Sequence, residues 1–338
     1  MLLFTCAYPA LKSPRSAAHA MMRVLHVTEC FGGGVKRAIE ARASASPRYE
    51  HHLLHSGFEA VAEDAPFASL TQLPQGHFAA LRAIQKAVTK IRPDIIHAHS
   101  SWAGVHVRLL RRSRPVVYEP HCFKFDDPSL SAPVRGLLHL AERVLAPRTT
   151  VFATLSAYES RLTRGVNSTV PVVRLENTPS IAPAEHSARG ERQRDSIVML
   201  GRITRQKDPQ FFIETIRECQ RREPRLHAVW IGDGDAAGRR ELERAGIEVT
   251  GWLDSDGIRA RLANAVYVHT GMYEGLPLSI LDAAAADAPV AARDILSIRD
   301  LPVMLHSNPA DLGAAACELS VPGPRQAAAL RANAWIRK

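Results

Sequence analysis

The chain has 338 residues, of which 46% are hydrophobic and 23% charged, and its formal net charge is +9. This composition is that of an ordinary globular protein and excludes a long disordered chain, and the length exceeds what one hydrophobic core usually serves, so we expect two domains. The five cysteines show no C-x-x-C or paired spacing, which favours a reducing compartment and argues against a cysteine zinc site.

Residues 1–21 are expected to form a disordered extension. The short apolar run Met1-Leu2-Leu3-Phe4 precedes the basic residues Lys12 and Arg15, which is the reverse of the order in a signal peptide, and it is too short to span a bilayer. The folded protein is therefore expected to begin at Met22 and to be cytoplasmic.

From residue 22 the sequence alternates between apolar strands and helical patterns. A buried strand at residues 23–28 is followed by Gly32-Gly33-Gly34 and a helix at residues 35–43. Later strands are expected at residues 50–56, 94–98, 115–119, 151–155 and 172–175, with helices such as 77–91 and 132–145 between them. Strands that alternate with helices in this way predict a parallel sheet covered by helices.

A second series of the same kind follows a segment without periodicity. Residues 179–194 are rich in Ala, Pro, Ser and charges, and we expect them to link a domain at residues 22–178 to a domain at residues 195–338. Strands of the second series are expected around Ile197, Ala228, Glu248, Val266, Pro289 and Val303. The sequence therefore predicts an α/β protein with two Rossmann-like, doubly wound parallel-sheet domains.

The first strand of the second series leads into a loop with two cations. This strand, residues 196–200, runs into the loop that holds Arg202 and Lys207, and Asp208-Pro209 then forms an N-cap with proline at the first helical position. Arg202 can bind a phosphate with its planar fork and Lys207 as a point charge. The alternative is that both are solvated loop cations.

The segment from Tyr273 to Ala283 predicts a strand end, a Gly-Pro turn and a helix that begins near Leu276. Its unpaired N–H groups and positive dipole end can receive an anionic diphosphate. Glu274 can take sugar hydroxyls, and Asp282, two turns along the helix, can reach a ribose. The alternative is an ordinary capped helix with a surface acid.

Three motifs in this order resemble the C-terminal domain of the group 1 (family four) retaining glycosyltransferases of GT-B fold. They are Gly201-Arg202 with Lys207, Gly232-Asp233-Gly234-Asp235, and Glu274-Gly275-Leu276-Pro277. The resemblance implies a nucleotide diphosphate sugar donor in a cleft between the two domains and transfer to an acceptor hydroxyl with retention, without a cofactor or metal ion. It implies catalytic roles for Arg202, Lys207 and Glu274, and donor contacts for Gly275, Leu276 and Asp282.

The chain departs from the family pattern at several positions. The family has a second glutamate where this chain has Asp282, glycine is usual at the position of Asp287, and Arg293-Asp294-Ile295-Leu296 replaces a Gly-rich turn. Two alternatives therefore stay open: a non-catalytic nucleotide-sugar-binding relative, and a GT-B epimerase that acts on the nucleotide sugar.

The resemblance is weaker in the N-terminal half. Gly33 and Gly34 match a glycine loop that closes over the donor, where the backbone must approach a ligand, and His121 matches a histidine that faces the donor sugar. A lone histidine is more often structural, and both readings of His121 are retained.

Two further patterns resemble metal sites. Asp233-Gly234-Asp235 and Asp254-Ser255-Asp256 are acid-x-acid triplets, but each follows a strand and opens a helix, so we expect helix capping. His97 and His99 lie on one face of a strand and are suited to zinc, but no third ligand is apparent, so the structural interpretation is favoured.

Charge is uneven along the chain. Residues 1–178 carry 22 Lys and Arg against 13 Asp and Glu, whereas residues 179–338 carry 21 of each. In the family this half binds the acceptor, so the basic residues are candidates to meet a lipid-linked or saccharide acceptor or an anionic membrane surface on the cytoplasmic side: Lys86, Lys90, Arg92, Arg108, Arg111, Arg112 and Arg114. The alternative is a solvated basic face. Nucleic acid is not expected, because no interleaved aromatic residues or binding module accompany this run.

Overall fold

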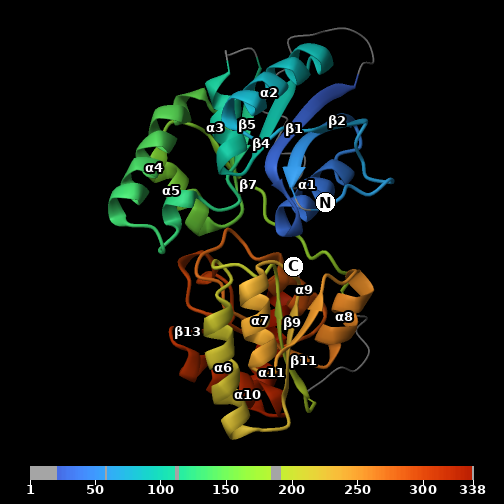
Figure 1. Cartoon of the computed structure of the whole chain (residues 1–338), viewed down its shortest axis with the longest axis vertical. Coiled ribbons are helices and arrows are strands. Elements are labelled where there is room, and N and C mark those ends of the chain that lie inside the picture. Colours follow the sequence, from blue (N-terminus) through green and yellow to red (C-terminus); the bar gives the residue numbers. More distant parts are fainter. Residues whose placement is uncertain (1–20, 58, 111–113, 184–191, 337–338) are drawn as a thin grey trace. The chain divides into compact units, whose positions relative to one another are not determined.

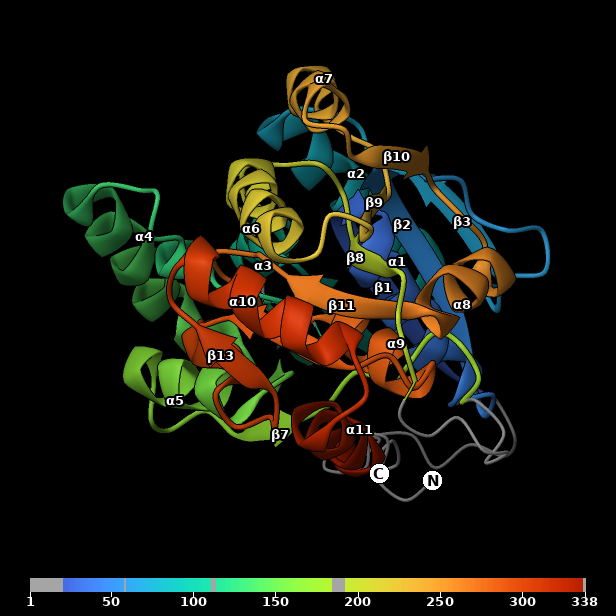
Figure 2. The ribbon, with the colours of Figure 1, turned by 90° about the horizontal axis from the view of Figure 1, so that it is seen from below.

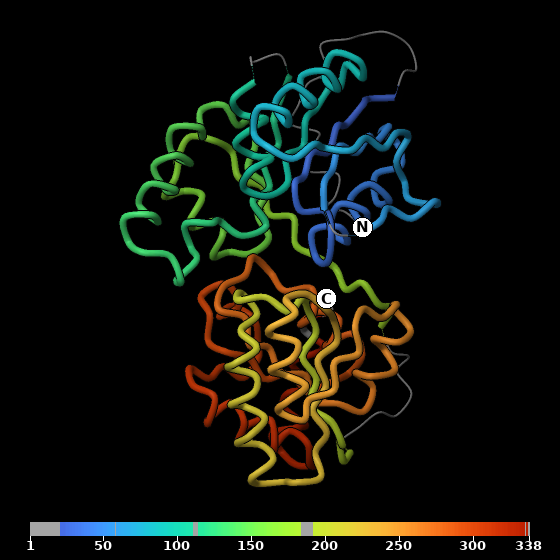
Figure 3. The backbone as a smooth tube through the Cα atoms, in the orientation of Figure 1, coloured from blue at the N-terminus to red at the C-terminus, as the bar shows by residue number. Residues whose placement is uncertain are grey.

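The structure is a computed structural model that describes residues 21–57, 59–110, 114–183 and 192–336. Contacts between Cα atoms divide the chain into two compact units, Met1–Asn177 and Thr178–Lys338, called here the N-terminal and C-terminal units. Of the expected extension at residues 1–21, only Met21 lies within the described residues. Figure 3 traces the chain through both units.

The N-terminal unit contains a seven-stranded parallel sheet in the order β3-β2-β1-β4-β5-β6-β7. The strand order reverses between β1 and β4, as in a doubly wound fold. The strands are β1 (Met22–Phe31), β2 (Tyr49–Gly57), β3 (Ser69–Gln72), β4 (Ile95–His99), β5 (Val116–Glu119), β6 (Val151–Thr154) and β7 (Val172–Arg174).

Alternation along β1 explains how helices cover this sheet. Leu25 and Val27 belong to a core cluster that also holds residues of α2 and α3, whereas Val24 and His26 lie on the other face, where Leu53, the register partner of His26, packs with Ile39 of α1 (elements labelled in Figure 1). The helices are α1 (Gly33–Ser44), α2 (His77–Ile91), α3 (Ser101–Leu109), α4 (Ala132–Leu145) and α5 (Ala157–Val166), with short 3₁₀ turns η2 (Lys124–Asp126) and η3 (Ala146–Arg148).

The C-terminal unit repeats this architecture with a six-stranded parallel sheet in the order β10-β9-β8-β11-β12-β13. Its order reverses between β8 and β11. The strands are β8 (Ser196–Leu200), β9 (His227–Ile231), β10 (Glu248–Gly251), β11 (Ala265–His269), β12 (Val290–Arg293) and β13 (Met304–His306).

Helices lie on both faces of this second sheet. Those that pack together on one face include α6 and α10, and α8 and α9 lie on the other (Figure 2). The helical elements are α6 (Pro209–Arg222), α7 (Ala236–Arg244), α8 (Ser255–Ala263), α9 (Leu278–Ala285), η4 (Leu296–Ile298), α10 (Pro309–Ser320) and α11 (Pro324–Ile336). The prediction of two Rossmann-like parallel-sheet domains is confirmed.

Two helix starts differ from the prediction. Helix α1 begins at Gly33 instead of residue 35, so both Gly33 and Gly34 belong to its first turn. Helix α9 begins at Leu278 instead of near Leu276, because Pro277 has extended backbone angles and serves as the N-cap.

The acidic triplets cap helices, as predicted. Asp235 accepts a hydrogen bond from the Gly238 N–H at the start of α7, and Asp254 accepts one from the Gly257 N–H at the start of α8. Asp208 does the same for Phe211 at the start of α6.

The expected linker at residues 179–194 packs against the C-terminal unit at both of its described ends. Ile181 is buried in that unit's core. Arg194 is buried at the other end and donates hydrogen bonds to the carbonyl oxygens of Ala263 and Asp287 at 2.8 and 3.2 Å. Residues 184–191 lie outside the described residues.

The prediction that Arg108 belongs to an exposed basic face is wrong. Its side chain is buried, donates to a Glu142 carboxylate oxygen at 2.8 Å, and lies over the Tyr118 ring at 4.0 Å from the centroid. A cation this deep is retained because it is paired and hydrogen-bonded. Of the other basic residues, Lys86, Lys90 and Arg92 are exposed and Arg114 is half-buried. Arg111 and Arg112 lie outside the described residues.

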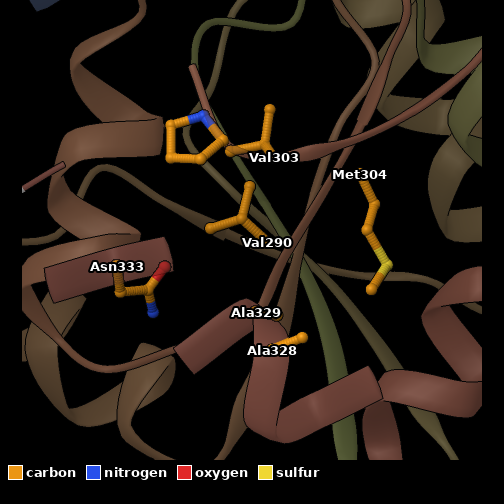
Figure 4. A pocket seen from close by; sticks show the side chains of 7 residues that line it. Val290, Val303, Met304, Ala328, Ala329 and Asn333 are labelled. Atoms are coloured by element: carbon orange, nitrogen blue, oxygen red, sulfur yellow. The ribbon is translucent and has the colours of Figure 1, made fainter. Parts of the chain in front are cut away.

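A hollow of about 170 Å³ lies in the C-terminal unit at the amino ends of β12 and β13 (Figure 4). Its lining is mainly apolar and includes Val290, Met304 and Ala329, with Asn333 at one side. Ligands of open α/β sheets bind at the opposite, carboxyl ends of the strands. The hollow therefore plays no part in the site described next.

Within the described residues, no helix is both long and apolar enough to cross a membrane.

Candidate active site

The loops that carry the predicted catalytic residues meet at the switch point of the C-terminal sheet. Arg202 and Lys207 follow β8, and Glu274 follows β11. These two strands are neighbours at the point where the strand order reverses. In open α/β sheets, connections diverge at such a point to opposite faces, and ligands bind there at the carboxyl ends of the strands.

Lys207 and Glu274 are in direct contact. The Lys207 ammonium donates a hydrogen bond to Glu274 Oε1 and forms an ion pair with it. Both side chains are largely buried, with 16% and 12% of their surface exposed. His269 Nε2 lies 3.7 Å from the same carboxylate oxygen, and burial together with the Lys207 charge holds the pKa of His269 well below its usual value. The site thus combines a cation, a carboxylate and a neutral imidazole.

Two glycines make room for this pair. A Cβ atom at Gly201, whose φ is +155°, would lie 3.1 Å from Lys207 Cε. A Cβ atom at Gly271 would lie 3.0 Å from Glu274 Oε1 and 2.8 Å from His269 Nε2. The positive φ therefore favours glycine at Gly201, and the close approach of the His269 and Glu274 side chains favours it at Gly271.

Hydrogen bonds join the two loops beside the ion pair. The Gln206 side-chain amide donates a hydrogen bond to the Tyr273 carbonyl at 2.8 Å. The backbone carbonyl of Gln206 accepts one from the Met272 N–H at 2.8 Å. The Thr270 hydroxyl donates to the Lys207 carbonyl at 2.7 Å. These contacts fix the Lys207 loop against the Glu274 loop, and sequence reasoning missed them because they join residues more than 60 positions apart.

The start of α9 differs from the starts of α6, α7, α8 and α10 in the same unit. Helices α6, α7, α8 and α10 have Asp or Asn at the N-cap, each accepting a backbone N–H. The N-cap of α9 is Pro277, whose side chain has no acceptor. The positive end of α9 therefore has no capping side chain from its N-cap, and the binding of an anion there, next to Gly275 and Leu276, stays a prediction.

The predicted motif after β9, Gly232-Asp233-Gly234-Asp235, lies against the loop that carries Arg202 and Lys207. The Ile203 N–H donates to the Asp233 carbonyl at 2.9 Å, and the Trp230 indole donates to the Gly201 carbonyl at 2.8 Å. A Cβ atom at Gly234 would lie 2.3 Å from the Ile203 carbonyl oxygen. The motif thus supports the loop, and the Arg202 side chain is exposed beside it.

Arg293, which replaces part of a Gly-rich turn of the family, also has a definite place. It donates to Asp208 Oδ2 at 2.7 Å and its guanidinium lies 4.3 Å from the Phe211 ring centroid. Asp208 itself has a left-handed φ of 54°. Arg293 therefore holds the end of the loop that carries Lys207 from β12, which is separated from β8 by β11.

Asp282 is fully buried, and its side chain contacts Ser180, close to the first residue of the C-terminal unit. Its carboxylate accepts from the Ser180 N–H at 2.6 Å and from the Ser180 hydroxyl at 2.8 and 2.7 Å. The predicted contact with a ribose stays a prediction, and it requires the carboxylate to share or exchange these partners.

Asp287 shows why the family has glycine at this position. Its φ is 56°, in the left-handed region. The Ala288 N–H donates to the Ala283 carbonyl at 2.9 Å and the Asp287 N–H to the Ala284 carbonyl at 3.2 Å. These are the two bonds of a Schellman motif at the end of α9, in which Asp287 takes the glycine position.

In the N-terminal unit, carboxylates already occupy two helix starts at the switch point. The Gly33 N–H, at φ +54°, donates to Glu59 Oε1 at 2.6 Å. Glu29 accepts from the Trp102 and Ala103 N–H groups at the start of α3, at 3.0 and 2.8 Å. A Cβ atom at Gly33 would have no atom within 4 Å. Glycine is therefore favoured here by the left-handed φ and not by a close contact inside the unit.

His121 belongs to a buried cluster and not to an isolated position. Its Nε2 lies 3.0 Å from His99 Nδ1, and its Nδ1 lies 3.5 Å from Glu119 Oε1. Its side chain is 8% exposed, and burial lowers its pKa to about 4. A contact with a donor sugar stays a prediction, and it requires the ring to turn from these partners.

Sequence family models match both units. The family described as "Glycosyl transferase 4-like domain" matches residues 12–178, and the family described as "Glycosyl transferases group 1" matches residues 194–320. A Klebsiella pneumoniae protein described as an uncharacterized 41.2 kDa protein in the cps region is 22% identical and aligns with 83% of this chain and 83% of its own length.

Solved structures show the same fold. The Anabaena protein HepE in complex with UDP and glucose superposes with a TM-score of 0.72 at 15% identity, over 93% of this chain and 94% of its own. Sucrose-phosphate synthase from Thermosynechococcus elongatus superposes with a TM-score of 0.67 at 17% identity, over 94% and 91%. With two parallel-sheet units, both family matches and this likeness, the chain belongs to the group 1 glycosyltransferases of GT-B fold.

Proposed function

We propose that this glycosyltransferase moves a sugar from a nucleotide diphosphate to an acceptor hydroxyl with retention of the anomeric configuration and without a metal ion in the reaction. The observation that carries the proposal is the Lys207–Glu274 pair at the switch point, beside a helix start that lacks a capping side chain. A neighbour of the same fold contains UDP and glucose, which supports a nucleotide-linked donor.

Each residue has a proposed role in this reaction. As the bond to the leaving diphosphate breaks, negative charge grows on its oxygens, and Arg202, Lys207 and the N–H groups near Gly275 and Leu276 stabilise it. A diphosphate competes with Glu274 for the Lys207 ammonium and thereby releases the carboxylate for the sugar hydroxyls. Asp282 is proposed for the ribose, and Gly33, Gly34 and His121 for the sugar side of the donor.

We further propose a lipid-linked or saccharide acceptor and a place in polysaccharide or glycolipid biosynthesis. The Klebsiella relative from a cps region supports this assignment. The exposed cations Lys86, Lys90 and Arg92 of the N-terminal unit support a peripheral, cytoplasmic position on an anionic membrane surface. The domain bounds proposed from the sequence, with the donor on residues 195–338 and the acceptor on residues 22–178, are retained.

A screen of nucleotide sugars by thermal shift tests the donor assignment, because a bound ligand raises apparent stability according to its affinity. We expect one nucleotide sugar to raise the melting temperature and the purified protein to release its nucleoside diphosphate in the presence of an acceptor. Binding without release of nucleotide would favour the non-catalytic alternative. Conversion into an epimeric nucleotide sugar would favour the epimerase alternative.

A further inference from the structure

Helix α4 of the N-terminal unit turns an apolar face to solvent. Leu137, Leu140 and Val144 have 67%, 55% and 68% of their surface exposed. At 3.6 residues per turn, these three side chains fall within an arc of roughly 60° around the helix. They form the outer face of α4. Apolar residues grouped in this way on a helix normally face a core, so the outer face is suited to burial against something outside the unit.

The opposite face of α4 is already held by the rest of the unit. Glu142 and Leu145 are buried there, and Leu138 packs against the core cluster that contains residues of α2 and α3. The Glu142 carboxylate accepts hydrogen bonds from Arg108 at 2.8 Å and from the Tyr118 hydroxyl at 3.0 Å. Because these contacts fix the rotation of the helix about its axis, α4 cannot roll inward to bury its outer face.

Arginines accompany the outer face, whereas exposed carboxylates do not. Within residues 128–170, all of which the structure describes, the only carboxylates are Glu142 and Glu159, and both are buried. The same segment has no lysine and five arginines, all exposed: Arg135, Arg143, Arg148, Arg161 and Arg164. The first two lie on α4 and the last two on α5, which packs beside α4 (Figure 1). The surface of this segment therefore combines apolar side chains with positive charge.

We infer that the outer face of α4 docks on a bilayer that contains anionic lipids. The inference rests on the proposed peripheral position of this glycosyltransferase and names the surface that enters the lipid interface. The apolar side chains lie at the boundary between headgroups and acyl chains, and the arginine forks meet the headgroup phosphates. The exposed cations Lys86 and Lys90 lie on α2, which packs on the same core cluster as α4 and hence on the same face of the sheet.

A second copy of this chain fits the outer face less well. In a two-fold contact through α4, the same surface meets itself, so Arg143 and its neighbours would face like charges. A stable protein interface also takes about 20–30 residues from each side, whereas the outer face belongs to a single helix of 14 residues. Charge and size therefore both favour the anionic bilayer.

Sedimentation with lipid vesicles tests the docking. The full-length protein is mixed with vesicles of phosphatidylcholine and phosphatidylglycerol in equal parts, and separately with vesicles of phosphatidylcholine alone. We expect the wild type to bind the anionic vesicles more tightly than the neutral ones and to be released by salt. The double variant Leu137→Gln/Val144→Gln should bind the anionic vesicles at least about tenfold more weakly.

Two further variants complete the comparison. The matched control Leu70→Gln removes an exposed leucine from the edge strand β3 of the same unit and should bind as the wild type does. The single variant Val144→Gln, at a position that is 68% exposed, should show a smaller loss than the double variant. Circular dichroism establishes that each variant is folded.

The stabilisation of each protein by the nucleotide sugar is measured in parallel, because the double variant should keep it in full. If the wild type binds no anionic vesicles, or if the folded double variant binds them as tightly as the wild type, the inference is overturned while the donor assignment is judged by its own readout. Loss of binding in Lys86→Gln/Lys90→Gln alone would assign the docking to α2 instead. A wild-type dimer that the double variant dissociates in sedimentation velocity would make a second copy the occupant and would equally overturn the inference.

Discussion

Lys207 and Glu274 neutralise each other across the switch point of the C-terminal sheet, 67 positions apart in the sequence. The pair is largely buried, so neither charge can be left alone without cost when the other is removed. In the proposed mechanism, a diphosphate that enters beside α9 offers Lys207 a second partner. The ion pair would then couple donor binding to the release of the Glu274 carboxylate, and several expectations depend on this proposal.

The first prediction concerns the cation. Lys207→Ala should lower turnover by roughly two orders of magnitude, which is the scale for loss of one preorganised electrostatic donor. Arg205→Ala removes an exposed cation from the same loop and should leave turnover within about twofold of the wild type. Steady-state kinetics of both variants make the comparison. Equal turnover in a folded Lys207→Ala protein would remove Lys207 from the proposed mechanism.

The second prediction concerns Asp282. Because its carboxylate is fully buried and accepts from the Ser180 N–H and hydroxyl, Asp282→Ala should lower the free energy of unfolding by about 1–3 kcal/mol. Asp282→Glu restores the family's residue but adds a methylene group at a packed position, so it should also destabilise, by about 1–3 kcal/mol.

Urea unfolding measures both changes at Asp282, with Asp287→Asn as a control on the same helix end. Ser180→Ala should lose less than Asp282→Ala, since the backbone N–H bond survives. If Asp282→Ala is as stable as the wild type while its affinity for nucleotide drops, the residue serves the ribose and not the fold.

The third prediction concerns backbone strain at Asp287. The left-handed φ of 56° is less favourable in free energy for a residue with a Cβ atom than for glycine. Asp287 takes the position in the Schellman motif where glycine is usual. Asp287→Gly should therefore raise the free energy of unfolding by about 0.5–1 kcal/mol, whereas Asp287→Val should lower it. Thermal unfolding of the two variants decides the sign, and a loss of stability in Asp287→Gly would contradict the assignment.

The fourth prediction is a pH dependence that arises from Glu159. Burial raises its pKa to about 8; the Leu155 N–H hydrogen bond lowers it, and Glu119 raises it further. A pKa above the unfolded value means that this group's stabilising contribution is fully present below about pH 4.5 and is lost as pH rises through 8. The N-terminal unit of Glu159→Gln should therefore lose less stability than the wild type between pH 5 and pH 8, by an amount on the order of a few kcal/mol.

The control for this dependence is Glu176→Gln, a carboxylate of the same unit whose side chain is 51% exposed. It should follow the wild-type curve. Urea midpoints at a series of pH values give the comparison, and parallel curves for the wild type and Glu159→Gln would show that Glu159 is ionised in the folded protein.

Local sequence signals predicted much of the fold and part of the site. The strand before Arg202, the proline that starts α6 and the acidic caps of α7 and α8 are determined within a few residues of chain, so periodicity and capping chemistry reveal them. The same holds for the glycine-proline turn before α9. The family resemblance then follows from the order of these local motifs.

Features that depend on pairing between distant strands were not predicted. The edge strand β3 is short and largely exposed, so it lacks an apolar signature. Arg108 reads as a surface cation until Glu142 and Tyr118, which follow later in the chain, enclose it. The position of His26 opposite His97 depends on sheet register, which is set by tertiary packing. Only the three-dimensional arrangement shows these relationships.

Titration calorimetry of a nucleoside diphosphate into the wild type, Lys207→Ala and Glu274→Gln tests the proposed donor site most directly. The nucleotide is that of the donor found by the thermal-shift screen. In the proposed site, loss of Lys207 removes a phosphate partner, so Lys207→Ala should bind this nucleotide at least about tenfold more weakly. Loss of the Glu274 charge frees the ammonium from its internal partner, so Glu274→Gln should bind the nucleotide as tightly as the wild type or more tightly. If Lys207→Ala binds it as well as the wild type, or if Glu274→Gln binds it more weakly, the ion pair does not mark the donor diphosphate site and the account is contradicted.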